Sequence, residues 1–363
     1  LNYFANGFHM AKGLDVGTMN IVSAWEADGN TQLVKERNAF IELDYTEIAD
    51  QVLSSSDLIY SRTDDKVRIL GDEALNFANI FNTEVQRPMS QGVLASGATP
   101  SMPMLKTLIE HVVGDPTHPG ETLYFTSPTN PIDSDIDTLY HRRAITSFLN
   151  DLGYDAQFVH EGMAVVYAAL SDNEFTGLGI SFGAGMTNVC LSYCAEPVVQ
   201  FSIARGGDWI DTKAANATAM SKDRITAIKE DSLTLAREPD ISGAEGAVAV
   251  YYDSLVEHLI EMIRTELDDE EIKDTLDIPV VITGGTSSPD GIVDLFTDHL
   301  ESADLGVSIS DVRDVDDPLY TVAQGTLIAA HSDSHTSTVT PDSDDQQTEQ
   351  ATAADSAEWT FDF

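Results

Sequence analysis

The stretch GLGISFGAGMTNVCLS (residues 177–192) places strand-forming residues on both sides of an interruption at Gly183 and Gly185. Glycine inside a strand pattern marks a turn or a close approach of the backbone to another group. The same arrangement occurs earlier in the chain, in AKGLDVGTMNIVSA (residues 11–24), around Gly17. Two similar strand–turn–strand units predict a duplicated fold that holds one ligand from both sides.

The residues before the two turns indicate what that ligand is. When Gly17 and Thr18 are aligned with residues 185–187, Asp15 precedes the first turn and Ser181 precedes the second. Backbone amides in a glycine-rich turn bind phosphate oxygens, and a carboxylate beside them binds Mg²⁺, mostly through water. Taken alone, each turn is also compatible with a plain β-hairpin.

The chain is strongly acidic. Its 363 residues include 61 Asp and Glu against 19 Lys and Arg, which gives a formal net charge of -42. Self-repulsion of that size destabilises a compact state at low salt, and high salt screens it. We therefore expect a cytoplasmic protein of a halophile, with a merely acidic mesophilic protein as the alternative. Nucleic acid and anionic membrane surfaces are not expected as direct partners.

Strand patterns alternate with helical periods along most of the chain, which predicts an α/β architecture with mixed sheets. Two blocks, from about residue 36 to 86 and from about 206 to 276, interrupt this alternation and are interpreted as insertions into two related cores. Helices are expected over 72–80, 102–113, 135–152, 161–171, 207–220, 222–237, 246–267, 290–300 and 318–331.

The two ends of the chain are expected to lie outside the fold. The opening LNYFANGFHM (residues 1–10) is interpreted as a tag remnant, and no signal peptide or membrane span is expected. Residues 332–363 form an acidic, Ser- and Thr-rich tail that is expected to be disordered. It ends in Trp359, Phe361 and Phe363, which either dock a partner protein or fold back onto the body without a function of their own.

A third motif completes the pattern. In PVVITGGTSSPDGIVDLF (residues 279–296), an apolar strand ends in Gly284, Gly285 and Thr286, where a base or ribose can lie against the backbone. The order of the two turns, this loop and DDPLYTVAQGTLIAA (residues 316–330) resembles the actin ATPase superfamily.

Within that superfamily the sequence is most similar to actin and MreB. RILGDEALNFA (68–78) resembles a segment of actin's small subdomain, and RPMSQGVLA (87–95) resembles the stretch that returns from it in MreB. GGDWIDTKAA (206–215) and AIKED (227–231) resemble a helix start of the family and a nucleotide-contacting segment of actin. Together with the acidity, this likeness points to the haloarchaeal actins, the group that includes salactin and its near relative volactin.

The resemblance implies an actin-like ATPase fold with a nucleotide cleft between two halves, duplicated ribonuclease-H-like cores that each carry a small inserted subdomain. The implied boundaries are 11–35, 87–160 and 305–331 for subdomain IA, 36–86 for IB, 161–205 and 277–304 for IIA, and 206–276 for IIB.

The resemblance also implies the site residues. Asp15 would lie at Mg²⁺, and Glu161 would orient the attacking water, although an acid that is merely favoured by the helix dipole is an alternative reading of Glu161. Ser181 departs from the family, which usually has Asp there, and this puts the rate of hydrolysis in doubt. Contacts to ATP or ADP are implied for Gly17, Thr18, Met19, Asn20, Gly183, Ala184, Gly185, Met186, Thr187, Gly206, Gly207, Asp208, Lys229, Glu230, Gly284, Gly285 and Thr286.

The expected function is that of an ATP-hydrolysing cytoskeletal protein that polymerises head to tail, so its main partner is a second copy of itself. A non-polymerising, nucleotide-gated adaptor or chaperone-like ATPase of the same superfamily is the alternative. A chaperone would be expected to carry a folded substrate domain after the core, and an adaptor to have its small subdomain missing or relocated. A sugar kinase would need a catalytic base and a sugar pocket in longer insertions.

Overall fold

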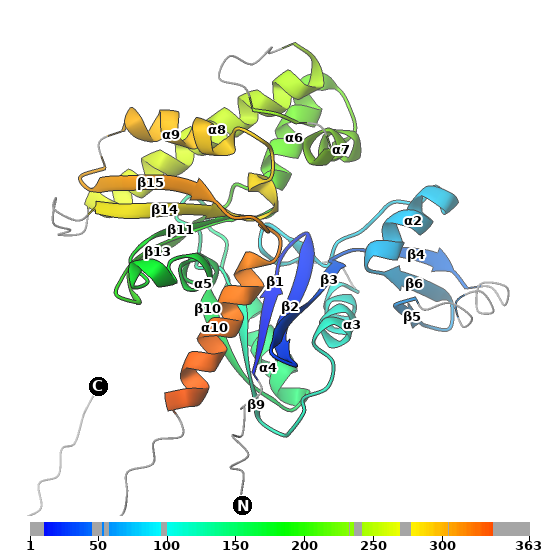
Figure 1. The fold of residues 1–363 in the computed structure, drawn as a ribbon. Helices are drawn as coiled ribbons and strands as arrows, with labels where there is room; N and C mark the ends of the chain where they lie inside the picture. Colours follow the sequence, from blue (N-terminus) through cyan, green and yellow to red (C-terminus); the bar gives the residue numbers. More distant parts are fainter. Residues whose placement is uncertain are drawn as a thin grey trace, which may run out of the picture.

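The computed structural model describes residues 11–45, 53, 58–95, 100–231, 233–235, 242–268, 277–303 and 305–336. Two five-stranded sheets form the centre of the molecule (Figure 1). The first has the order β10-β9-β1-β2-β3 and consists of β1 (Lys12–Val16), β2 (Asn20–Ala27), β3 (Asn30–Arg37), β9 (Glu121–Ser127) and β10 (Tyr154–His160). The second has the order β13-β12-β11-β14-β15 and consists of β11 (Gly177–Phe182), β12 (Thr187–Tyr193), β13 (Glu196–Ile203), β14 (Asp277–Thr283) and β15 (Ser308–Asp314).

The two sheets have the same topology. In the first, β1, β2 and β3 are antiparallel neighbours, while β9 and β10 continue the sheet from β1 in parallel. In the second, β11, β12 and β13 are antiparallel, and β14 and β15 continue from β11 in parallel. The prediction of an α/β fold built from two related cores is confirmed.

This equivalence corrects one expected boundary. Residues 305–331 were assigned to the first half, but β15 pairs with β14 in the second sheet. Its place there corresponds to that of β10 in the first sheet. The assignment of residues 308–314 is therefore wrong, because β15 completes the second copy of the duplicated sheet.

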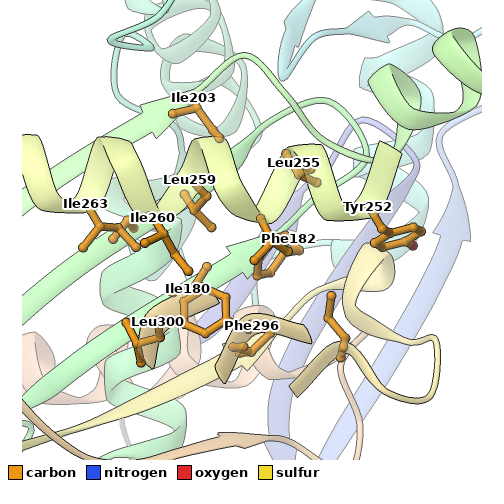
Figure 2. Close-up of a cluster of buried hydrophobic side chains, with 14 of the residues drawn as sticks. Ile180, Phe182, Ile203, Tyr252, Leu255, Leu259, Ile260, Ile263, Phe296 and Leu300 are labelled. Atoms are coloured by element: carbon orange, nitrogen blue, oxygen red, sulfur yellow. The ribbon is translucent and has the colours of Figure 1, made fainter. Parts of the chain in front are cut away.

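One long helix covers the second sheet. Helix α8 (Gly243–Asp268) buries Tyr252, Leu255 and Leu259 against Ile180 and Phe182 of β11 (Figure 2). In the first half, α3 (Ser101–Val113) contacts β2 and β3. Although α8 falls inside the block 206–276 that was expected to be an insertion, it supplies the core of the second half. The other helices around the two sheets are α4 (Leu139–Asp151), α6 (Gly207–Thr218), α7 (Lys222–Asp231) and α9 (Ile292–Glu301).

Two helices pack against each other where the halves meet. Helix α5 (Glu161–Ala169) follows β10 of the first sheet but packs on β11 and β12 of the second. Helix α10 (Thr321–Thr336) follows β15 of the second sheet but packs on β1 and β9 of the first (Figure 1). Their backbones touch at Gly325 and Ala164, where a β-carbon on Gly325 would collide with the Ala164 carbonyl.

The remaining elements form the smaller subdomain and the connection back from it. The small sheet has the order β4-β6-β5, with β4 (Phe40–Asp44), β5 (Tyr60–Arg62) and β6 (Lys66–Leu70), and α2 (Asp72–Phe81) packs on it. The chain returns through the short strands β7 (Met89–Ser90) and β8 (Val93–Leu94).

The ends of the chain are only partly described. Helix α10 continues to Thr336, so the first residues of the segment 332–363 are helical rather than disordered as expected. The rest of that tail, with Trp359, Phe361 and Phe363, and the segment 1–10 lie outside the described residues. Among the helices that the structure describes, none is long and apolar enough to cross a membrane.

Candidate functional site

The two glycine turns are closed by the same backbone hydrogen bond. The amide of Gly17 donates to the Asn20 carbonyl between β1 and β2, and the amide of Gly183 donates to the Met186 carbonyl between β11 and β12, both at 3.0 Å. Gly17 therefore corresponds to Gly183, not to Gly185 as the sequence alignment of the turns had it. In this register Asp15 and Ser181 occupy equivalent positions, two residues before each turn.

The two turns also touch each other. The Thr18 hydroxyl of the first turn accepts a hydrogen bond from the amide of Gly92, which lies between β7 and β8, at 3.0 Å. Gly185 of the second turn lies so close to both groups that a β-carbon there would collide with the Gly92 nitrogen and the Thr18 hydroxyl. The two turns, one from each duplicated unit, thus lie against each other. That they hold one ligand between them stays a prediction.

A cleft of about 280 Å³ lies over the two turns. Residues of both halves line the cleft, and those of the first half include Lys35 and Arg37 at the end of β3. It brings together most of the site residues expected from the sequence. The expected residues that line it are Asp15, Gly17, Thr18, Met19, Asn20, Glu161, Gly183, Ala184, Gly185, Met186, Lys229, Glu230, Gly284, Gly285 and Thr286.

Four expected residues do not line the cleft but lie behind the second turn. The amides of Gly207 and Asp208, at the start of α6, donate to the carbonyls of Gly183 and Ala184 at 3.0 and 2.8 Å. The Thr187 hydroxyl donates to the Arg205 carbonyl, and Gly206 precedes α6 as its N-cap. Thr187, Gly206, Gly207 and Asp208 therefore support the second turn from behind.

Asp15 is held in one orientation at the base of the cleft. Its Oδ1 accepts a hydrogen bond from the Thr126 hydroxyl at 2.8 Å, and the Val16 amide donates to the oxygen of the same hydroxyl at 3.0 Å. Burial raises the pKa of Asp15 above the ordinary carboxyl range, and the hydrogen bond from Thr126 lowers it in part. A positive charge placed beside this carboxylate would offset that burial cost.

Glu161, the first residue of α5, is a second partly buried carboxyl group facing the cleft. Its Oε2 accepts hydrogen bonds from Asn188 Nδ2 at 2.7 Å and from Ser181 Oγ at 3.3 Å. Burial, and next the nearby charge of Asp15, raise the pKa of Glu161, while the hydrogen bonds from Ser181 and Asn188 act in the opposite direction. The pKa of Glu161 is thereby raised to about 8, so the group holds its proton at neutral pH. A cation beside it would lower this pKa and leave a carboxylate that can accept a proton.

The third loop is tied to the second turn. Gly284 ends β14 with a φ of 98°, a conformation that favours glycine. Two residues later, the Thr286 hydroxyl donates to the Gly183 carbonyl at 2.9 Å. Tyr252 of α8 holds the loop from the other side by donating to the Thr286 carbonyl at 2.9 Å.

Charged pairs occupy the upper part of the cleft. The Lys229 ammonium is buried and pairs with Asp211 of α6 at 2.8 Å. Its neighbour Glu230 pairs instead with Arg37 of the first half at 3.1 Å, across the cleft. A second pair between the halves, outside the cleft, joins Arg87 to Asp208 at 2.7 Å. Separating the two halves would break both pairs.

Sequence reasoning missed several of these residues. Thr126, Asn188 and Arg37 carry no motif of their own, and each acquires its role from a partner far away in the sequence. The one available signal for Asn188 was its position on β12, directly after the second turn, from which its side chain reaches Glu161.

The carboxylates in the cleft fit a divalent cation only if other ligands complete its shell. Within the ranges that the structure describes, no three His, Cys, Asp or Glu side chains form a group that could hold a metal. Asp15 and Glu161 are nevertheless two partly buried acidic groups, and a cation would offset the cost of removing their charges from water. Mg²⁺ commonly binds through one or two carboxylates, with phosphate oxygens and water as its remaining ligands.

The chain is similar to known proteins in sequence and in fold. A protein-family model described as Volactin matches residues 10–330. The solved structure described as the MamK double helical filament has a TM-score of 0.67 with 20% identity, over 88% of this chain and 98% of that chain.

MreB5 of Spiroplasma citri bound to AMPPNP has a TM-score of 0.64 with 15% identity, over 90% of this chain and 97% of that chain. The same protein bound to ADP gives 0.64 and 15%, over 91% and 99%. At these identities the likeness shows a shared actin-like fold. A search of curated protein sequences finds no match.

Proposed function

The chain is an actin/MreB-like protein of the Volactin family, and on that basis we propose that it binds and hydrolyses ATP and polymerises head to tail into filaments controlled by the state of the nucleotide. The observation that carries the proposal is the contact between the two equivalent turns at the base of a cleft that two partly buried carboxyl groups, Asp15 and Glu161, also line. The family match and the fold shared with a filament subunit support it.

The phosphates of ATP would bind at the tips of the turns. Among the hydrogen bonds of the described residues, the amides of Thr18, Met19, Ala184 and Gly185 act as donors in none. Amides grouped in this way form an anion-binding nest. The base and ribose would then lie between Gly284 and the Lys229 helix, which line the same cleft.

Mg²⁺ would be held beside the phosphates by Asp15, with Thr126 fixing the carboxylate. When bound, the ion would neutralise phosphate charge. Glu161 would then orient a water molecule and accept its proton, while Ser181 and Asn188 fix the Oε2 atom. Ser181 contributes a hydroxyl donor to Glu161 where the family usually has a second carboxylate, so turnover is expected to be slow.

The affinity for Mg²⁺ in the presence of ADP is expected to rise with pH. Because burial raises the pKa values of Asp15 and Glu161, these groups hold protons at a pH where ordinary carboxyls are ionised, and a cation must displace them. Full displacement of one proton strengthens binding about tenfold per pH unit. Calorimetric titration with MgCl₂ at pH 6 and pH 8, in buffers of different ionisation enthalpy, measures both affinity and proton release.

Two variants serve as a test and a control for this expectation. Asp15→Asn should bind Mg²⁺ more weakly and release fewer protons. Asp28→Asn, in an exposed turn where the φ of 53° suits asparagine, should behave as wild type. An affinity that is the same at both pH values would contradict a site built on these carboxyl groups.

Assembly is expected to need both ATP and molar salt. Each subunit carries a net charge of -42, and raising the salt from 0.1 to 1 M shortens the screening length from about 10 to about 3 Å. Light scattering and electron microscopy with ATP and MgCl₂ should therefore show filaments in molar KCl and none at low salt. Samples without nucleotide are the control.

The other outcomes of this experiment are also informative. A chain that binds ATP in molar KCl but stays monomeric at every concentration would contradict polymerisation and support the non-polymerising adaptor. A chain that binds no ATP there would contradict the whole proposal.

A further inference from the structure

A chain of buried hydrogen bonds leads from Glu161 away from the cleft. Asn188 Nδ2 donates to Glu161 Oε2 at 2.7 Å, and Ser202 Oγ donates to Asn188 Oδ1 at 2.7 Å. Asn188 on β12 and Ser202 on β13 are directly paired across the strands, and both are almost fully buried. Ser202 therefore reaches Glu161 through the asparagine between them, and its Oγ also lies 3.5 Å from Nε2 of His160, the residue directly before Glu161.

The far end of the chain reaches the other half of the molecule. The Ser202 oxygen accepts a hydrogen bond from the Thr129 amide at 3.1 Å and lies 3.0 Å from the Thr129 hydroxyl. Thr129 follows β9 of the first sheet. The main chain makes the same connection, because Ile132 donates to the Ser202 carbonyl at 2.9 Å and Pro131 forms a β-bridge with Ser202.

The hydrogen bonds next to Glu161 have a definite direction. The Asn188 amide nitrogen donates to Glu161 Oε2 and the Asn188 oxygen accepts from Ser202, which is the arrangement that an ionised Glu161 requires because a carboxylate only accepts. Because Ser202 donates its single hydroxyl proton to Asn188, its lone pairs are available to Thr129 and to His160 Nε2. None of these side chains can rotate without losing a hydrogen bond. The orientation of Ser202 therefore influences that of Asn188, and Asn188 influences that of the Glu161 carboxyl group.

Resting on the proposed ATPase function, we propose that Ser202 is a positioning residue that makes the orientation of the Glu161 carboxylate depend on contact between the two halves. A relative movement of the halves acts first on the segment 129–132 and on Ser202. Loss of the Ser202 hydrogen bond frees Asn188 to rotate, and Glu161 then loses its shortest hydrogen bond. Hydrolysis is thereby restricted to arrangements of the halves in which Thr129 and Ser202 are in contact.

The test is Ser202→Ala in the full chain, measured in molar KCl with MgCl₂. The kcat of ATP hydrolysis should fall about tenfold, whereas the Kd for ATP should stay close to wild type. The melting temperature should fall modestly, because the variant leaves Asn188 Oδ1 and the Thr129 amide without their partner. Ser192→Ala is the matched control, since Ser192 lies on β12, is equally buried and has an Oγ without a hydrogen-bond partner in the described structure. It should leave kcat unchanged.

Combined variants show whether the effect passes through Glu161 and through the contact between halves. Ser202→Ala should add nothing to the low kcat of Glu161→Gln, because both act on the same group. Thr129→Val should lower kcat in the same direction as Ser202→Ala, and the two together should give less than the product of their separate effects.

Failure of the proposed ATPase function and failure of the positioning role of Ser202 would give different results. A wild-type chain that does not hydrolyse ATP overturns the proposed function, and the positioning role with it. A wild-type chain that hydrolyses ATP while Ser202→Ala keeps its full kcat overturns only the positioning role. A parallel loss of kcat, ATP affinity and melting temperature in Ser202→Ala would show that Ser202 is merely structural, which also overturns it.

Discussion

Replacing Glu161 with glutamine is expected to lower the rate of ATP hydrolysis by about two to three orders of magnitude, the usual contribution of a general base. Glutamine has the same size and can still accept the hydrogen bonds from Ser181 and Asn188 that hold Oε2. It cannot accept the proton of the attacking water. ATP binding and assembly should therefore survive, and filaments should accumulate because their nucleotide is no longer hydrolysed.

Phosphate release in molar KCl measures this effect, with ATP affinity measured on the same samples. Glu196→Gln makes the same chemical change at an exposed position on β13 and should hydrolyse ATP as wild type does. If Glu161→Gln retained hydrolysis within a few-fold of wild type, the interpretation of Glu161 as a helix-start acid favoured by the dipole would replace the catalytic one.

Replacing Gly185 with alanine is expected to abolish assembly by separating the two turns. The added β-carbon would overlap the backbone nitrogen of Gly92 and the hydroxyl of Thr18. These two groups are hydrogen-bonded to each other, so displacing either disturbs the contact between the first turn and the β7–β8 connection. Forcing an extra methyl group into a tight contact costs about 2 kcal/mol, which corresponds to about a thirtyfold loss of ATP affinity.

Fluorescence titration with a labelled ATP analogue measures the loss of ATP affinity, and light scattering measures the loss of assembly. Gly114→Ala is the control: Gly114 ends α3 with a φ of 65° and has nothing within 4 Å of its missing β-carbon. The φ of 65° and ψ of -162° at Gly114 form a combination that essentially only glycine adopts. The variant should therefore lose stability but no ATP affinity. Wild-type ATP affinity in Gly185→Ala would mean that the contact between the turns does not shape the site.

The duplicated architecture was predictable because its signal is local. A strand, a glycine turn and a second strand are contiguous in the sequence, so the pattern repeats visibly at residues 11–24 and 177–192. The exact equivalence was harder to see, since glycines alone do not show which amide closes a turn. The hydrogen bonds of Gly17 and Gly183 show that these two glycines are equivalent. The sequence alignment had paired Gly17 with Gly185, two residues further along.

Other strands escaped prediction because their burial is supplied by neighbours. β15 (SISDVRD) is largely polar and exposed, and its place at the edge of the second sheet comes from parallel pairing with β14. β3 (NTQLVKER) shows no clear alternation of apolar residues. Such edge strands owe their position to the strand beside them rather than to their own periodicity.

The supporting residues of the site were missed for a related reason. Arg37 and Glu230 are 193 residues apart, and Thr126 and Asp15 are 111 apart. Sheet pairing and the closing of the two halves bring these side chains together, and a single sequence shows neither. Motifs at the turns were visible because each is a few residues long.

The exchange of α5 and α10 between the halves has a consequence for how the polypeptide matures. The first sheet is made early in the chain, yet α10, which packs on β1 and β9, consists of Thr321–Thr336. The apolar surface of the first sheet that α10 covers therefore stays exposed to solvent until nearly the whole chain has left the ribosome. The core of each half is covered by a helix that follows the last strand of the other half. Neither half can therefore fold by itself, and we expect both to unfold together in one cooperative transition.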